Sequence, residues 1–233
     1  MTKRVKGIPD TTGLLCMTSI LFACLFIMVS CKQKAKSSSM DELANTDLLR
    51  ITKSHLCIDT IQQLIQSGDL IMRTGIDFTS QALKQFCQTD PTYSHCGIVL
   101  KENDSFFVYH AIGGETNPNQ TLQREWLPVF CDGNSCNAVG IFRFIMDSTT
   151  LSREKEFIKK KYADHLLFDM SFDLKTDNKM YCSEFVAKTL IYAFQNNQLL
   201  DTTFVQQYAY FAPDNIFKNK NCTEIHRFNY SSK

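Results

Sequence analysis

The chain is poor in the residues that mark fibrous and low-complexity proteins, with only five prolines and nine glycines in 233 residues. This scarcity excludes a collagen-like or low-complexity chain, and the sequence shows no internal repeat. Acidic and basic residues nearly balance, 24 against 25, and no basic block occurs. We therefore expect no nucleic-acid partner.

The N-terminus has the pattern of a secretory signal, which is a basic start, a short apolar core and a small residue before a cleavage point. The apolar run covers residues 14–30, and Met28-Val29-Ser30-Cys31 resembles a bacterial lipobox. In such a motif Cys31 is lipidated and becomes the first residue of the mature protein, although its first position is usually leucine rather than methionine. The run is short for a membrane span, which needs about 20 residues, and an uncleaved membrane anchor is the alternative.

We expect three parts in the chain: a lipoprotein signal peptide over residues 1–30, a flexible tether over 31–46 and one domain over 47–233. The tether is polar and serine-rich without apolar periodicity, as linkers are. The remaining length is enough for a substantial core. A lipid on Cys31 would hold this domain to a membrane of the bacterial cell envelope, on the periplasmic side or at the surface.

Helical and alternating patterns are mixed along the domain, which predicts an α+β fold with strands at the centre and helices around them. The expected helices cover residues 47–66, 78–87 and 151–167, with a further one beginning at Cys182. The expected strands cover residues 70–73, 94–101, 105–112, 137–145 and 223–230.

Cys182 stands at the predicted start of an amphipathic helix, in the sequence Tyr181-Cys182-Ser183-Glu184-Phe185. The free N–H groups and the positive dipole end of a helix N-terminus stabilise a thiolate and lower the pKa of a cysteine placed there. Cys182 is therefore a candidate nucleophile. A buried, small apolar side chain is the alternative for any cysteine taken alone.

Two histidines are predicted to lie side by side on a hairpin. Asn103 and Asp104 suit a two-residue turn between the strands on either side. In that register His95 and His110 share one face as diagonal neighbours, with Gly97 leaving room between them. A slip of one residue would send them to opposite faces. A satisfied core or surface histidine is the alternative for each one taken singly.

The segments Ser94-His95-Cys96-Gly97, Val108-Tyr109-His110-Ala111 and Tyr181-Cys182-Ser183-Glu184 resemble the successive motifs of the permuted papain-like amidases of the YiiX/YebB type. These enzymes are a circularly permuted branch of the NlpC-type cysteine peptidases, and the resemblance covers roughly residues 65–215. It implies a circularly permuted papain-like fold, with a central antiparallel sheet flanked by helices, and no cofactor.

The resemblance implies that His95 is the base and Cys182 the nucleophile, because the histidine precedes the cysteine in this family. Many members carry a glutamate at the third catalytic position, where this chain has His110. A histidine is found there in the related lecithin retinol acyltransferase group. The departure leaves open whether the reaction is amide hydrolysis or acyl transfer.

The implied activity is that of a cysteine amidase or peptidase working through a thioacyl intermediate. His95 takes the proton of Cys182, the thiolate attacks a carbonyl, and His110 orients His95. The envelope location favours amide-linked peptide or small-molecule substrates, including peptidoglycan-derived peptides. Two alternatives stay open: an acyltransferase or lipid amide or ester hydrolase of the lecithin retinol acyltransferase type, and a non-catalytic binding lipoprotein.

Three further residues near the motifs are weaker candidates for substrate binding: Asp69, Asp169 and Tyr181. Turn and helix-terminus capping is the alternative for the two short carboxylates. Cys131 and Cys136 flank a turn that would let them form a disulfide in an oxidising envelope.

A zinc site is the competing function class, since His95, Cys96, His110 and Cys182 are all of zinc-ligand type. The sequence lacks any paired Cys-x-x-Cys or His-x-x-x-His spacing. His95 and Cys96 are also adjacent on a predicted strand, so their side chains point to opposite faces. We therefore expect no metal.

Overall fold

The computed structural model describes residues 42–114, 117, 119–205 and 207–231. The chain divides into two compact units, residues 1–46 and 47–233. The predicted signal peptide and the predicted lipidation site Cys31 lie outside the described residues. Within the part that is described, no helix combines the length and the apolar character needed to cross a bilayer.

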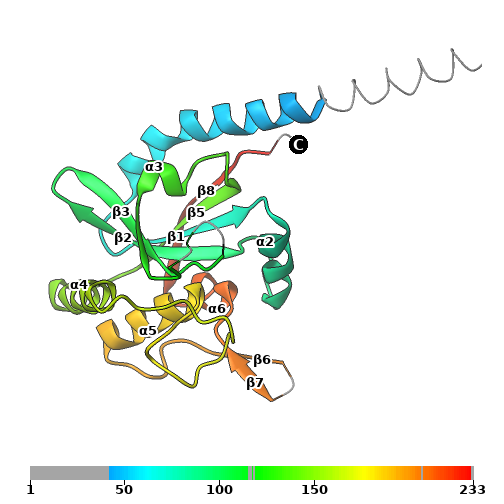
Figure 1. The fold of residues 1–233 in the computed structure, drawn as a ribbon. Coiled ribbons are helices and arrows are strands. Elements are labelled where there is room, and N and C mark those ends of the chain that lie inside the picture. The colour runs from blue at the N-terminus through cyan, green and yellow to red at the C-terminus, as the bar shows by residue number, and fades with distance from the viewer. Residues whose placement is uncertain (1–41, 115–116, 118, 206, 232–233) are drawn as a thin grey trace, which may run out of the picture. The chain divides into compact units, whose positions relative to one another are not determined.

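Six antiparallel strands form the central sheet in the order β4-β3-β2-β1-β5-β8 (Figure 1). The strands are β1 (Leu70–Gly75), β2 (His95–Glu102), β3 (Ser105–His110), β4 (Gln123–Trp126), β5 (Cys136–Phe144) and β8 (Cys222–Asn229). A separate pair consists of β6 (Thr203–Val205) and β7 (Tyr208–Tyr210).

Helices cover both faces of this sheet. The segment 47–64 of the first helix lies over one face together with α3 (Leu127–Phe130), and α5 (Cys182–Phe194) lies below the other face (Figure 1). The remaining helical segments are α2 (Phe78–Leu83), the 3₁₀ turn η1 (Lys84–Phe86), α4 (Ser148–Ala163) and α6 (Pro213–Phe217). The predicted α+β fold, with a central antiparallel sheet flanked by helices, is confirmed.

Alternation along the strands builds two cores, one on each face of the sheet. Met72 and Cys96 belong to the core that contains Phe185 of α5. Ile71 and Val99 belong to the opposite core, with Phe130 of α3. Consecutive residues of β2 face different cores, so His95 and Cys96 point to opposite faces of the sheet.

Two helix boundaries differ from the prediction. The first helix already includes residues 42–46, which were expected to belong to the tether, and the strong helix formers Leu43 and Ala44 extend it. Helix α4 begins at Ser148 because the Asp147 carboxylate accepts the Thr150 N–H at 2.6 Å, an N-cap that fixes the start of the helix.

The hairpin between β2 and β3 has the predicted register, with Glu102 opposite Ser105. Asn103 supplies the positive φ that the turn needs, at 53°. Gly97 is required by close packing: a Cβ there would lie 2.6 Å from Val108 Cγ1 and 3.0 Å from His110 Cβ. The absence of a side chain at residue 97 therefore makes room for the second histidine.

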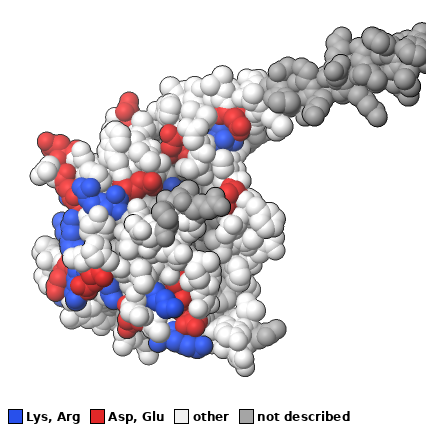
Figure 2. Space-filling view, viewed as in Figure 1, with Lys and Arg blue, Asp and Glu red and all other residues white. Residues whose placement is uncertain are grey.

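Charged side chains are mixed in sign over the face drawn in Figure 2, with no wide area of one sign. One cluster joins the hairpin to α4: Glu102 contacts both Arg124 and Lys159. These contacts lie at the turn end of the hairpin, whereas His95 and His110 lie at its other end, on β2 and β3.

Candidate functional site

The candidate nucleophile occupies the first position of α5. Cys182 is buried, with 7% of its surface exposed. Tyr181 precedes the helix in extended conformation, and its N–H donates to the Glu184 carboxylate at 3.3 Å. The apolar face of α5, including Phe185, packs into the core beneath the sheet. This packing fixes the helix start, and with it the sulfur, beside β2.

Cys182 and Cys96 form an unequal pair of thiols. Hydrogen bonding from Cys96 lowers the pKa of Cys182 well below its usual range against the effect of burial, and the charge and hydrogen bonding of His95 lower it further. Burial, then Cys182 itself, raises the pKa of Cys96. Cys182 is therefore the more acidic thiol of the pair.

The two predicted histidines are in direct contact. His95 Nε2 lies 2.9 Å from His110 Nδ1, and the two rings meet edge to face with centroids 5.0 Å apart. Phe130 of α3 packs against both rings, at 5.8 Å and 5.1 Å between centroids. The structure thus places His95 and His110 in direct contact, as the register of their hairpin predicts.

A carboxylate and a guanidinium complete the surroundings of His110, and the sequence did not predict either. Glu125 of β4 places Oε2 3.5 Å from His110 Nε2, and Arg73 Nη1 lies 3.7 Å from the same oxygen. The signal for Glu125 is weak, because a strand of four residues is too short for its alternation to stand out. Arg73 ends the predicted first strand but belongs to no motif.

Burial and charge set the protonation states of His110 and Glu125 at neutral pH. Burial lowers the pKa of His110 to about 3, although Glu125 opposes that shift. Burial would raise the pKa of Glu125, but His110 and then Arg73 bring it below its usual value. His110 is therefore uncharged and Glu125 ionised.

Asp69 does not lie at this site. Its carboxylate is buried and binds Arg143 through two contacts, Nε to Oδ1 at 2.6 Å and Nη2 to Oδ2 at 2.7 Å. Asp69 adjoins the β1 end where Leu70 pairs with Ile98, three positions along β2 from His95, and a strand rises about 3.3 Å per residue. Both Asp69 oxygens are used in this structural pairing, and the substrate-binding role of Asp69 stays a prediction.

Asp169 and Tyr181 lie next to the helix start but are also occupied by structural contacts. The Asp169 carboxylate accepts the N–H groups of Ser171 and Asp173, at 2.9 Å and 3.2 Å. The Tyr181 hydroxyl accepts the Phe211 N–H at 2.8 Å. The capping alternative therefore fits Asp169, and Tyr181 ties the start of α5 to the chain before α6.

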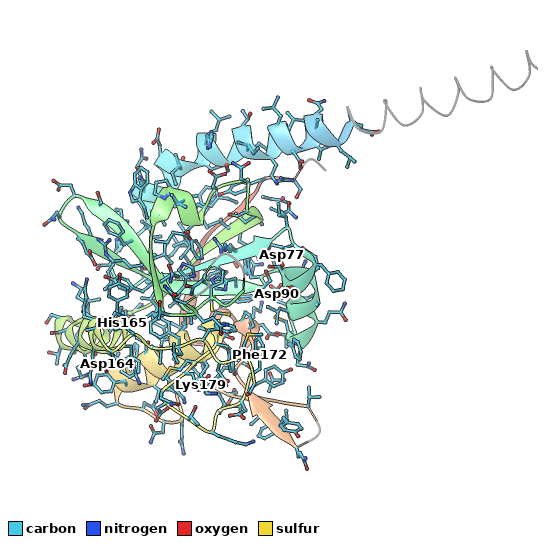
Figure 3. The ribbon with its side chains drawn as sticks, in the orientation of Figure 1. Asp77, Asp90, Asp164, His165, Phe172 and Lys179 are labelled. Carbon is cyan, nitrogen blue, oxygen red and sulfur yellow. The ribbon has the colours of Figure 1, made fainter. Side chains whose placement is uncertain are left out.

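The loop between α4 and α5 is fixed to the start of α5. Figure 3 marks Asp164, His165, Phe172 and Lys179 along it. The Phe172 ring packs on Tyr181 with centroids 5.4 Å apart. These contacts bring the loop close to the candidate nucleophile.

Cys131 and Cys136 are free thiols in the structure, so the predicted disulfide is not formed. Both side chains are buried in the core on the α3 side of the sheet, and Cys136 Sγ lies 3.4 Å from the Asp132 carbonyl oxygen. Burial raises the pKa of Cys136 to about 12, which makes this thiol a poor nucleophile at neutral pH.

Two cavities of about 240 Å³ each open elsewhere on the described surface. One lies beside Trp126 and His55, and the other beside Asp69 and Arg143. Neither includes Cys182 or His95, which keep exposed fractions of 7% and 8%. Both residues are thus largely buried and lie outside these two cavities.

Comparison with known proteins gives a fold. No family model and no curated protein matches the chain. Among solved structures, it resembles the crystal structure of the metalloprotein YiiX from Escherichia coli O157:H7, with a TM-score of 0.58 and 16% sequence identity. The match covers 71% of this chain and 98% of that chain. At this identity the likeness shows the fold alone, and the chain is a protein of YiiX-like fold.

Proposed function

We propose that this protein is an envelope-anchored cysteine hydrolase with a Cys182-His95-His110 site in a circularly permuted papain-like fold. One observation carries the proposal. His95 Nε2 lies 2.9 Å from His110 Nδ1, and the charge of His95 is among the causes that lower the pKa of the Cys182 thiol. A nucleophile, a base and a group that orients the base are the three parts that covalent acyl transfer needs.

The reaction that this arrangement supports has two halves. His95 takes the Cys182 proton, the sulfur attacks the substrate carbonyl carbon, and the main-chain N–H of Cys182 at the helix start meets the oxyanion. The carbon–nitrogen bond then breaks, and the amine leaves with the proton from His95. Water, deprotonated by His95, attacks the thioester and releases the acid and the free thiol.

The expected substrate is an amide of the cell envelope, with peptidoglycan-derived peptides as the leading class. This choice rests on the lipobox-like sequence that ends at Cys31, which predicts a lipid anchor to a membrane on the periplasmic side or at the surface. Transfer of the acyl group to an amine or alcohol, instead of water, uses the same thioester. The nature of the released product separates the two reactions.

YiiX is described as a metalloprotein, so a bound metal is the alternative to a cysteine hydrolase site. The residues here do not fit one: among the described residues no group of three or more His, Cys, Asp and Glu side chains is placed to hold an ion. His95 and His110 are joined directly at 2.9 Å. An ion bound tetrahedrally at about 2.0–2.1 Å from each nitrogen would hold the two nitrogens further apart.

The test is acylation of the full chain by the activated ester p-nitrophenyl acetate. We expect rapid release of p-nitrophenolate and one acetyl group on Cys182, located by mass spectrometry after proteolysis. Cys182→Ala removes the nucleophile and should abolish both signals. Cys57→Ser is the matched control, since Cys57 is a partly buried free thiol on the first helix, and should react like the wild type.

Acetylation of Cys182→Ala at the wild-type rate would refute the proposal, as would an acetyl group carried only by another cysteine. Once acylation is established, a synthetic stem peptide and a fatty-acid amide compare the substrate classes. Faster release of acid from the peptide supports the envelope amidase. Release from the lipid amide alone supports the acyltransferase-like alternative.

A further inference from the structure

We infer that Glu125 is a positioning residue: it fixes which ring nitrogen carries the proton in His110 and, through it, in His95, so that His95 turns an unprotonated nitrogen toward Cys182. The tautomers follow from the placement of the two rings and Glu125, together with the charge on that carboxylate. Their use in catalysis rests on the proposed function.

One carboxylate oxygen of Glu125 and one ring nitrogen of His110 face each other and lack other hydrogen-bond partners in the described part of the chain. Glu125 Oε2 and His110 Nε2 are both fully buried, and neither makes a hydrogen bond to any other described group. The two atoms face each other at 3.5 Å, slightly longer than an N–H···O bond of about 2.7–3.2 Å. Since buried polar atoms rarely stay unpaired, each of these two atoms is placed to serve as the partner that the other lacks.

The direction of this bond is set by the carboxylate. An ionised carboxylate only accepts hydrogen bonds, and a neutral imidazole has one donor and one acceptor nitrogen. His110 therefore carries its proton on Nε2, facing Glu125. Its Nδ1 is left as an acceptor.

The proton position in His110 also determines the one in His95. His95 Nε2 lies 2.9 Å from the His110 Nδ1 acceptor, so it is the donor of that bond. The remaining nitrogen of a neutral His95 is Nδ1, without a proton. His95 is among the groups that lower the pKa of the Cys182 thiol, and under the proposed function this nitrogen takes the thiol proton. The proton positions of both rings thus follow from one carboxylate on β4.

Arg73 keeps Glu125 in the accepting state. Its Nη1 lies 3.7 Å from Glu125 Oε2 and donates to the Phe130 carbonyl at 3.1 Å, while its guanidinium stacks over the Phe130 ring at 4.4 Å. A fixed positive charge favours the ionised carboxylate. A protonated Glu125 would be able to donate, and the tautomers would no longer be set.

A purely structural role for Glu125 is the competing explanation, in which it ties β4 to β1 through Arg73. Such a tie would affect stability but would leave the histidine protons where they are. A readout of tautomers, rather than of activity or stability, separates the two roles.

The experiment is NMR of the full chain with ¹⁵N-labelled histidine at neutral pH. The ¹⁵N chemical shifts and the couplings to ring protons distinguish protonated from unprotonated ring nitrogens. The spectra of His95→Asn and His110→Asn assign the two rings. We expect both histidines in the wild type to carry the proton on Nε2.

Glu125→Met removes the acceptor at similar size. It should give mixed or inverted tautomers for His95 and His110, because the His110 N–H would face no acceptor. Glu224→Met is the control, since Glu224 lies on β8 and pairs with Arg227, and should leave both rings unchanged. A wild-type His110 protonated on Nδ1 would overturn the inference, and so would wild-type tautomers in Glu125→Met.

The wild-type spectrum decides the matter even if Glu125→Met does not fold. The result is also independent of the proposed function, because tautomers are read in the resting protein. Expected tautomers with no acylation by p-nitrophenyl acetate would keep the role of Glu125 and reject the hydrolase. Acylation with the opposite tautomers would keep the hydrolase and reject the role of Glu125.

Discussion

The two ends of β1 hold buried charges in different ways. At the Asp69 end, Arg143 grips both carboxylate oxygens at 2.6 Å and 2.7 Å. At the Arg73 end, the guanidinium lies 3.7 Å from Glu125, and Glu125 lies 3.5 Å from His110. Since natural proteins pair their buried polar groups tightly, the looser end is the one where chemistry is expected.

An unpaired buried group is not sufficient evidence by itself. Glu154 lies near the Asp69 end and is completely buried, and neither of its oxygens has a hydrogen-bond partner among the described residues. Burial, then Asp69, raises the pKa of Glu154 to about 8, so it is mostly neutral at pH 7. What distinguishes the Arg73 end is that the loosely paired groups connect, through His110, to the ring of His95.

The largest expected difference between the Asp69 and Arg73 ends of β1 is the effect of removing His95, the proposed base. His95→Asn should slow acylation of Cys182 by about 10²–10⁴-fold, the usual loss for a general base. His110→Asn should cost less, because it orients the base without touching the substrate. The measurement is the rate of p-nitrophenolate release. Equal losses would show that His110 does more than orient.

Breaking the tight end should damage stability and spare the chemistry. Arg143→Met leaves the Asp69 carboxylate buried without its charge partner and should lower the free energy of unfolding by about 3–5 kcal/mol. The folded fraction should acylate at the wild-type rate. Urea titration and the acylation assay measure the two quantities on the same sample.

The matched control for Arg143→Met is Lys160→Met, which breaks the exposed pair with Asp164 at 2.8 Å. Its stability should stay close to that of the wild type, because exposed ion pairs contribute little. A loss of acylation in Arg143→Met, measured where the variant is folded, would contradict the separation of the two ends.

Glu154 should give the Asp69 end a pH dependence. Its folded-state pKa of about 8 lies above the ordinary 4.5, so its contribution is complete below pH 4.5 and is lost as the pH rises toward 8. Wild-type stability should therefore fall by about 1.4 kcal/mol per pH unit across that interval from this group.

Glu154→Gln removes that titration and keeps the size of the side chain. Urea midpoints at pH 5 and pH 8 should converge in the variant relative to the wild type. Glu184, whose pKa is raised to about 7 chiefly by burial, titrates in both proteins and cancels from the comparison. An unchanged difference between the two midpoints would show that Glu154 is already ionised at pH 5.

The sequence was sufficient for the parts of the site that depend on local rules. A two-residue turn fixes the register of its hairpin, so His95 and His110 were predictable as neighbours, and a helix start was predictable at Cys182 from apolar spacing. The motif order led to the same three residues. The YiiX-like fold agrees with the predicted type.

The remainder depends on contacts between distant segments. Glu125 reaches His110 only because β4 pairs with β3, placing Glu125 opposite Val108 and on the same face as His110. Asp69 looked available in the sequence because its partner Arg143 lies far along the chain, on β5. Neither pairing has a local signal, so periodicity and spacing could not have found them.

The hairpin turn at Asn103 also has a consequence for how the protein folds. The His95–His110 contact joins residues only 15 apart in sequence, so it requires the closing of a small loop. Cys182 follows only after a much longer chain segment, whose closure costs more entropy and is slower. A growing polypeptide would thus form its imidazole pair first and complete the proposed site only when most of the domain has been made.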